Sequence, residues 1–223
     1  WRAETPMCPG HLGACMVVAD LHVHTTNSDG TLTLDAIPDA ARRGGIDVVA
    51  VTDHDRLHPD LHVPVAVLDG VTVVHGVELR VDSPAGRVDL LGYGVNRTDA
   101  LVAALDRIQA DRIERARAIV DRVQTRLSVT LDVAFEQGVG RPHIARAIAD
   151  SDADYDYREA FAQLIGDGCP CYVPREIPDF ETGRDLLAEA CGLVALAHPF
   201  RYDDVEAALT LTDSLDGVER YYD

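Results

Sequence analysis

Residues 16–24 read MVVADLHVH, an apolar run that ends in two histidines separated by one residue. The apolar side chains predict a buried strand over residues 16–23. Side chains two positions apart on a strand point to the same face, so His22 and His24 can bind one ion together. Asp29 follows in a polar loop, 25–30, that can fold back toward them. This segment therefore predicts a metal site at the end of a strand.

Further apolar runs alternate with helical patterns along the rest of the chain. We expect strands over 46–51, 71–74, 88–91, 193–197 and 217–221, and helices over 34–43, 99–127, 142–149, 157–165, 182–190 and 204–209. Thr33 is expected to cap the first helix and Gly44-Gly45 to end it. This alternation predicts an α/β fold with a parallel sheet or barrel, in which catalytic groups lie at the carboxyl ends of strands. Polar residues stand at those predicted ends: His22, His24, Asp53, His54, Glu78 and His198.

Histidine and carboxylate ligands at these ends suit zinc, manganese or iron, and a carboxylate can bridge two ions. Two ions about 3.5–4 Å apart can clamp the attacking and leaving oxygens of a phosphoester displacement. Each motif alone has a simpler interpretation. The two histidines could be an accident of a loop, Asp53 and His54 a strand-end cap, and Glu78 a solvated residue. Their joint appearance at successive strand ends favours a shared site.

Composition limits the possible functions. The chain has 223 residues, 47% of them hydrophobic, and a net charge of -18. Such a charge repels bare nucleic-acid backbone and anionic membrane, so we expect no general DNA binding and no membrane association. All 20 basic residues are Arg, and Asp outnumbers Glu, which indicates either adaptation to a salt-rich cytoplasm or a GC-rich genome. Five cysteines without a CxxC pair are typical of a reduced, cytoplasmic protein.

Four motifs, DLHVHTTNSDG, VTDHD, GVEL and AHP, occur in this order and resemble the PHP (polymerase and histidinol phosphatase) family of metal-dependent phosphoesterases. The resemblance runs from about residue 17 to the end. It is strongest to the stand-alone nucleotide and RNA phosphoesterases, which also carry a motif like RPHIA (141–145). It implies a distorted seven-stranded (β/α) barrel with a small helical insertion. The expected parts are a non-conforming extension over 1–15 (an upstream extension or a misplaced start), the barrel over 16–98 and 181–223, and the insertion over 99–180.

The resemblance also implies a site of two or three divalent ions (Mn, Zn, Fe or Mg) at the mouth of the barrel. Asp89 stands where the family usually has a histidine, which favours Mn or Mg there. The Asp-x-His motif that family members carry on their last strands does not occur after His198. The C-terminus is therefore expected to be incomplete, or else Asp223 or a partner chain compensates. The implied ligands are His22, His24, Asp29, His54, Glu78 as the bridge, Asp89 and His198.

A metal-activated hydroxide is expected to attack phosphorus in line. The implied catalytic residues are Glu78, His198 and Arg141. The candidates for substrate binding are Arg141, His143, Arg146 and Arg201, with Arg175 also near a motif, since arginine fits phosphate with two hydrogen bonds. The alternatives are surface ion pairs for the arginines and a helix-start residue for His143. We expect Asp20, Asp53 and Asp55 to orient the imidazoles, and His75 not to be a ligand.

The resemblance points to a small nucleotide, such as a 3',5'-bisphosphate, or to the 5' end of a short RNA as substrate. No obligate protein partner is inferred. Two other functions stay open at this point: a non-catalytic, degenerate metal-binding module, and a proofreading exonuclease-type domain.

Overall fold

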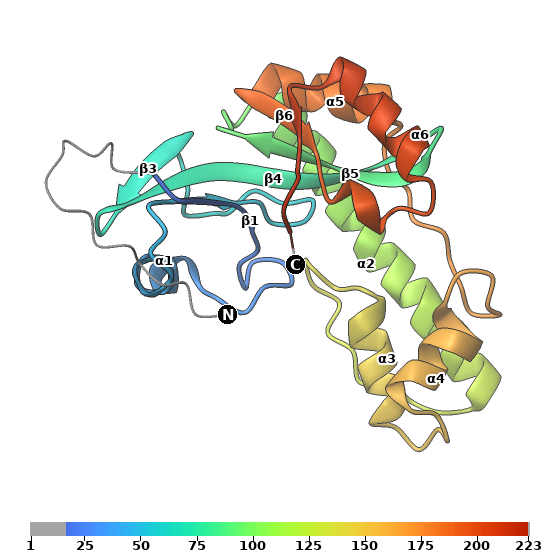
Figure 1. The fold of residues 1–223 in the computed structure, drawn as a ribbon. Helices are drawn as coiled ribbons and strands as arrows, with labels where there is room; N and C mark the ends of the chain where they lie inside the picture. The colour runs from blue at the N-terminus through green and yellow to red at the C-terminus, as the bar shows by residue number, and fades with distance from the viewer. Residues whose placement is uncertain (1–16, 223) are drawn as a thin grey trace, which may run out of the picture.

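The computed structural model describes residues 17–222, and its centre is one seven-stranded sheet (Figure 1). The strand order is β1-β2-β4-β5-β6-β7, and β3 pairs with β4 beside this path. Met16, the predicted start of the first strand, and the expected extension over 1–15 lie outside the described residues. The strands are β1 (Ala19–Val23), β2 (Val48–Val51), β3 (Val65–Leu68), β4 (Val71–Ser83), β5 (Gly86–Tyr93), β6 (Leu193–Leu196) and β7 (Gly217–Val218).

The sheet is mixed, whereas the sequence pattern predicted a parallel one. β1, β2 and β4 are parallel to one another, as are β6 and β7. The pairs β3–β4, β4–β5 and β5–β6 are antiparallel. The chain reverses between β4 and β5 in a tight turn that needs Gly86 at a φ of 89°. Two successive strands joined so closely can pair only antiparallel.

Strand β4 is much longer than the predicted strand over 71–74. Residues 72–75 pair with β2, and residues 76–83 pair with β5. Glu78 was predicted at a strand end, which is wrong, because it lies in the interior of β4. What ends beside it is β2, whose continuation makes a single bridge between His54 and Glu78. The strand end that lies beside Glu78 is therefore the end of β2, the strand next to β4.

The helices match the predicted segments with shifted ends. They are α1 (Ile37–Gly44), α2 (Asp99–Leu127), α3 (Arg141–Ala149), α4 (Tyr157–Ala160), α5 (Phe180–Ala190) and α6 (Val205–Thr210), and a π-helical turn, Phe161–Ile165, continues α4. Gly45 ends α1 in the left-handed conformation, as predicted, but the Thr33 side chain makes no capping bond. Within residues 17–222, no helix is long and apolar enough to cross a membrane.

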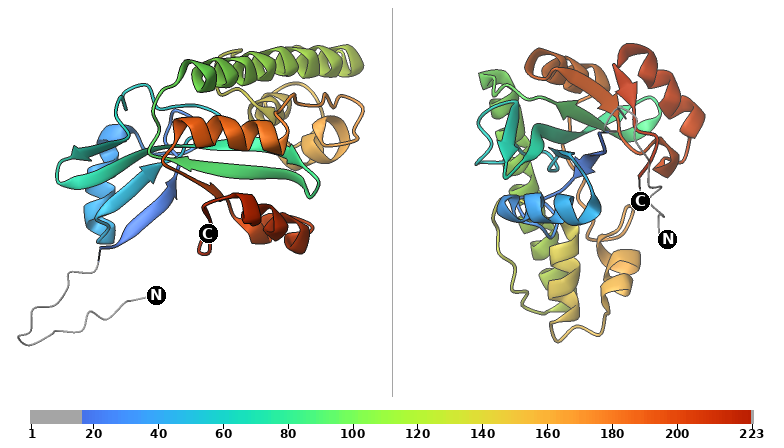
Figure 2. Two further views of the ribbon diagram at one scale, coloured as in Figure 1. Left: turned by 90° about the horizontal axis from the view of Figure 1, so that it is seen from above. Right: turned by 60° about the vertical axis from the view of Figure 1, so that its left-hand side comes forward.

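Buried side chains form separate clusters along α2. Its first half, with Leu101 and Ile108, packs with α5 against β4, β5 and β6. Its second half, with Ile119 and Val123, packs with α3 and the segment after α4 in a cluster of its own. Figures 1 and 2 show α2 running from the sheet to this group of short helices. The exact division at 99 and 180 stays a prediction.

Candidate metal centre

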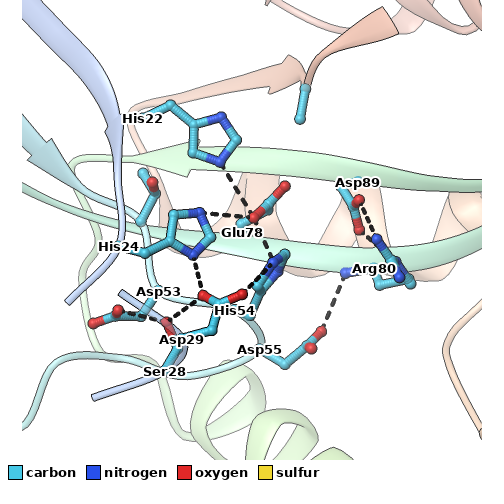
Figure 3. Close-up of polar contacts among 12 residues, drawn as sticks. His22, His24, Ser28, Asp29, Asp53, His54, Asp55, Glu78, Arg80 and Asp89 are labelled. Carbon is cyan, nitrogen blue, oxygen red and sulfur yellow. Dashed lines mark hydrogen bonds and ion pairs between the residues drawn. The ribbon is translucent and has the colours of Figure 1, made fainter. Parts of the chain in front are cut away.

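The carboxylate of Glu78 lies at the centre of four imidazoles, of which Figure 3 labels those of His22, His24 and His54. Its Oε2 is 3.2 Å from Nε2 of His22, 3.1 Å from Nε2 of His24 and 2.9 Å from Nδ1 of His54. Its Oε1 is 2.9 Å from Nε2 of His198. Glu78 is almost fully buried. Residues that are up to 176 positions apart in the sequence thus meet at one point, as the strand-end pattern predicted.

Each histidine reaches this point from a strand end. His22 lies in β1 and His24 directly after it, so alternation places both rings over Glu78. His54 follows β2. His198 follows β6 with a φ of 25° and a ψ of 60°, a left-handed conformation that is costly for a residue with a side chain. Such local strain is typical of functional sites, where surrounding contacts maintain it.

Asp29 reaches the site because the loop 25–30 folds back on β1. Its carboxylate lies 2.8 Å from Nδ1 of His24 and 3.6 Å from Nε2 of His54. Gly30 makes this turn possible, since a Cβ atom there would lie 2.0 Å from the backbone oxygen of His24. The prediction that this loop folds toward the histidines is confirmed.

Asp53 supports the loop and, among the described residues, contacts no imidazole, contrary to prediction. Its carboxylate accepts hydrogen bonds from Thr25 N at 2.7 Å, Thr25 Oγ1 at 2.8 Å and Ser28 Oγ at 2.7 Å. Within residues 17–222, Asp20 accepts one hydrogen bond, from the backbone N of His22 at 3.3 Å, and none from an imidazole. The prediction for Asp53 failed because Thr25 and Ser28 of the loop 25–30 already donate hydrogen bonds to both of its carboxylate oxygens.

Asp55 was also predicted to orient an imidazole, and it serves instead as a buried anion between arginines. Arg112 of α2 lies 3.1 Å from its Oδ2, and Arg175 lies 2.5 Å from the same atom. Burial opposes the charge of Asp55, but the two guanidinium groups outweigh it and lower the pKa of this carboxyl. Arg175, a predicted phosphate-binding candidate, instead pairs with Asp55 and so links the loop 169–178 to the segment that follows β2.

Glu219 takes the orienting role that was expected of the aspartates. Its Oε2 lies 3.1 Å from Nδ1 of His22 and accepts a hydrogen bond from the backbone N of His198 at 2.8 Å. The sequence pattern predicts a strand over 217–221, which hides Glu219 within it, whereas β7 ends at Val218. With the strand ending at Val218, Glu219 is a carboxylate directly after a strand end, which is the pattern that predicts a site residue.

The charges of the site are strongly coupled. Burial disfavours protonation of His22 and His24, but Glu219, Asp29 and Glu78 outweigh it and raise the pKa of His22 to about 9 and of His24 to about 10. The hydrogen bond from His24 lowers the pKa of Asp29 to about 2. Burial alone would raise the pKa of Glu78, yet the surrounding imidazoles lower it far below its ordinary range.

The donor set fits divalent ions. Three groups of potential ligands have donor atoms within 4.8 Å of one another: His22, His24 and Glu78; His24, Asp29 and His54; and Glu78, Asp89 and His198. Among the described residues, Oε2 of Glu78 accepts no hydrogen bond although three ring nitrogens lie close to it, and Nδ1 of His198 is buried without a partner. Nitrogens and oxygens that converge in this way without satisfying each other suit a cation shared among them.

The predicted substrate residues lie in three places. Arg201 lines a cleft of about 800 Å³ together with His22, His24 and His198. His143 and Arg146 line another cleft, of about 360 Å³, beside Asn27 and Ser28 of the loop that carries Asp29. The third place is that of Arg141, which pairs with Asp167 and lies over the ring of Tyr172. That pairing corresponds to the alternative interpretation, an ion pair outside the Glu78 cluster.

Comparison with known proteins agrees with this geometry. The sequence profile of the PHP domain matches residues 20–165. A 3',5'-nucleoside bisphosphate phosphatase of Chromobacterium violaceum is 31% identical over 84% of this chain and 69% of its own length. A 5'-3' exoribonuclease of Haemophilus influenzae is 28% identical over 82% of this chain and 69% of its own. A solved amidohydrolase structure from Chromobacterium violaceum, with bound sulfate, superposes with a TM-score of 0.68 at 26% identity, over 90% of this chain and 75% of its own.

Proposed function

Since the chain belongs to the PHP domain family and is a phosphoesterase of that family, we propose that it hydrolyses phosphate esters of small nucleotides or of the 5' ends of short RNAs. Two or three divalent ions would serve as cofactors, held by residues from among the seven predicted ligands. The activities named for the two relatives, on nucleoside bisphosphates and on RNA, support this substrate class. The cysteines within residues 17–222 are free thiols and support a cytoplasmic location as part of the same proposal; they are Cys169, Cys171 and Cys191.

One observation carries the proposal: a buried carboxylate, Glu78, is shared by imidazoles from three different strand ends. When bound, divalent ions activate a water molecule for attack on phosphorus and neutralise the phosphate charge. Glu78 would hold two of them together, and the imidazoles would fix their positions. Arg201, beside the histidines in the larger cleft, would hold a phosphate oxygen. His143 and Arg146 would contact the more distant part of the nucleotide.

Turnover with added Mn²⁺ tests the proposal. The substrates are a generic aryl phosphate, a nucleoside 3',5'-bisphosphate and a short 5'-phosphorylated RNA. We expect phosphate or nucleotide release by the wild type and its loss in the His22→Ala/His24→Ala double variant. His62→Ala is the matched control, because His62 is exposed and outside the ligand groups. Equal rates for the wild type and the double variant would remove the proposal.

The same assay separates the two alternative functions. A degenerate metal-binding module would bind Mn²⁺ and release no product from any substrate. A proofreading-type domain would shorten a single-stranded DNA from its 3' end, with little activity on the bisphosphate. We expect the opposite preference, because both named relatives act on nucleotides or on RNA from the 5' end.

A further inference from the structure

One corner of the site differs from the rest. Asp89 of β5 lies with Glu78 and His198 in a group of buried residues, and its Oδ2 is 3.5 Å from Nε2 of His198. By donor type, these three side chains could hold an ion. This group also lies beside a fixed positive charge, which pairs with Asp89.

That charge is Arg80. Arg80 and Asp89 are direct cross-strand partners in the β4–β5 ladder. Nε of Arg80 donates to Oδ1 of Asp89 at 2.7 Å, and Nη2 donates to Oδ2 at 2.6 Å (Figure 3). This two-pronged pair uses both carboxylate oxygens. An ion bound to Asp89 would lie beside the guanidinium of Arg80, so two positive charges would stand close together in a buried place.

The geometry points to Arg80 as a substitute for a metal ion at this corner, so that the chain binds two divalent ions and its guanidinium supplies the third positive charge. This inference rests on the proposed function and specifies it. The two ions would belong to the groups formed by His22, His24 and Glu78 and by His24, Asp29 and His54. Glu78 would serve both, because its Oε2 also lies 2.9 Å from Nδ1 of His54.

Arg80 is also placed to contact substrate. It lies two positions after Glu78 on β4, so both side chains project from the same face of the strand. Its side chain is 41% exposed, while that of Asp89 is 1% exposed. Nη1 of Arg80 makes no hydrogen bond to the described part of the chain, so it can donate to a phosphate oxygen. A fixed arginine would thus stabilise phosphate charge where an ion would otherwise do so.

The number of bound ions per chain tests, without relying on activity, whether Arg80 takes the place of a third ion. Each protein is equilibrated with Mn²⁺, passed through a desalting column and analysed for manganese per chain. We expect two ions for the wild type and three for Arg80→Ala, in which Asp89 becomes available. Arg80→Lys, which keeps a positive charge, and Arg80→Ala/Asp89→Asn, which removes the vacant carboxylate, should each hold two. Three ions in the wild type, or no gain in Arg80→Ala, would overturn the inference.

A second measurement tests the substrate contact. The double variant Arg80→Ala/Asp89→Asn leaves no unpaired buried charge, so we expect it to fold, which circular dichroism checks. Its KM for an aryl phosphate should rise about 10-fold or more, as expected for the loss of a charge-assisted hydrogen bond. An unchanged KM would overturn the substrate contact. A wild type that binds no manganese would instead overturn the metal site itself, and with it the proposed function.

Discussion

The carboxylate of Glu219 lies 3.1 Å from Nδ1 of His22, although 197 positions separate the two residues. This contact leaves Nε2 of His22 facing Glu78. A carboxylate that orients a ligand imidazole in this way typically changes metal affinity or activity by about 10- to 100-fold when it is removed. We therefore expect Glu219→Ala to lower Mn²⁺ affinity by about that factor, measured by titration calorimetry.

Glu219→Gln serves as the control for this experiment. It keeps the shape of the side chain and a hydrogen-bonding oxygen, so it should retain more of the affinity than Glu219→Ala does. If both variants bound Mn²⁺ as tightly as the wild type, the ring of His22 would be held by its strand alone.

Asp55 should contribute strongly to stability. It is fully buried and pairs with Arg112 and Arg175. Removing one partner of a buried ion pair leaves unpaired charge and costs roughly 3–5 kcal/mol. We expect Asp55→Ala to lower the free energy of unfolding in urea by about this amount. Asp185→Ala, which breaks the surface pair with Arg184, should cost only about 0–1 kcal/mol. Similar losses for both variants would contradict the assignment of Asp55 as a structural anion.

His75 predicts a pH dependence of stability. It was not expected to be a ligand, and it belongs to none of the three ligand groups. Burial, with a contribution from Arg97, lowers its pKa to about 4 from 6.5, and neither ring nitrogen has a hydrogen-bond partner in the described structure. The unfolded chain therefore binds a proton at this site between these pH values while the folded chain does not. Stability should fall as the pH drops from 6.5 towards 4, by up to roughly 3 kcal/mol.

Urea unfolding of metal-free protein at pH 7 and pH 5 measures the effect, with His75→Leu as the comparison. The variant removes the titrating group and two unsatisfied nitrogens, so it should lose less stability between the two pH values than the wild type. Identical slopes would show that other groups cause the pH dependence.

Gly30 should be required for the metal site, although it holds no ligand atom. A Cβ atom there would collide with the backbone of His24, so Gly30→Ala must move the loop that carries Asp29. We expect this variant to fold but to bind Mn²⁺ more weakly. Gly192→Ala is the control, because the nearest atom to its added carbon, Tyr93 O, lies at 3.6 Å, an ordinary contact. Unchanged affinity in Gly30→Ala would show that Asp29 can reach the site from another loop conformation.

The sequence predicted that the four histidines lie close together, because their signal is local. His22 and His24 follow strand alternation, and His54 and His198 directly follow apolar runs. What could not be predicted depends on pairing between distant segments. The interior position of Glu78 follows from the change of partner along β4, and the role of Glu219 from the short β7. Asp53 and Asp55 were misassigned because their nearest hydrogen-bond donors, in the loop 25–30 and on α2, belong to segments whose contacts no spacing rule reveals.

The β4–β5 hairpin also bears on the order of folding. Its strands are adjacent in the sequence, so they can pair early with little loss of chain entropy, and they carry Glu78, Arg80 and Asp89. The imidazoles of β1 and β6 must arrive from far along the chain. We therefore expect a nascent molecule to bring Glu78 and Asp89 together first, and to bind cations tightly only in the last steps of folding.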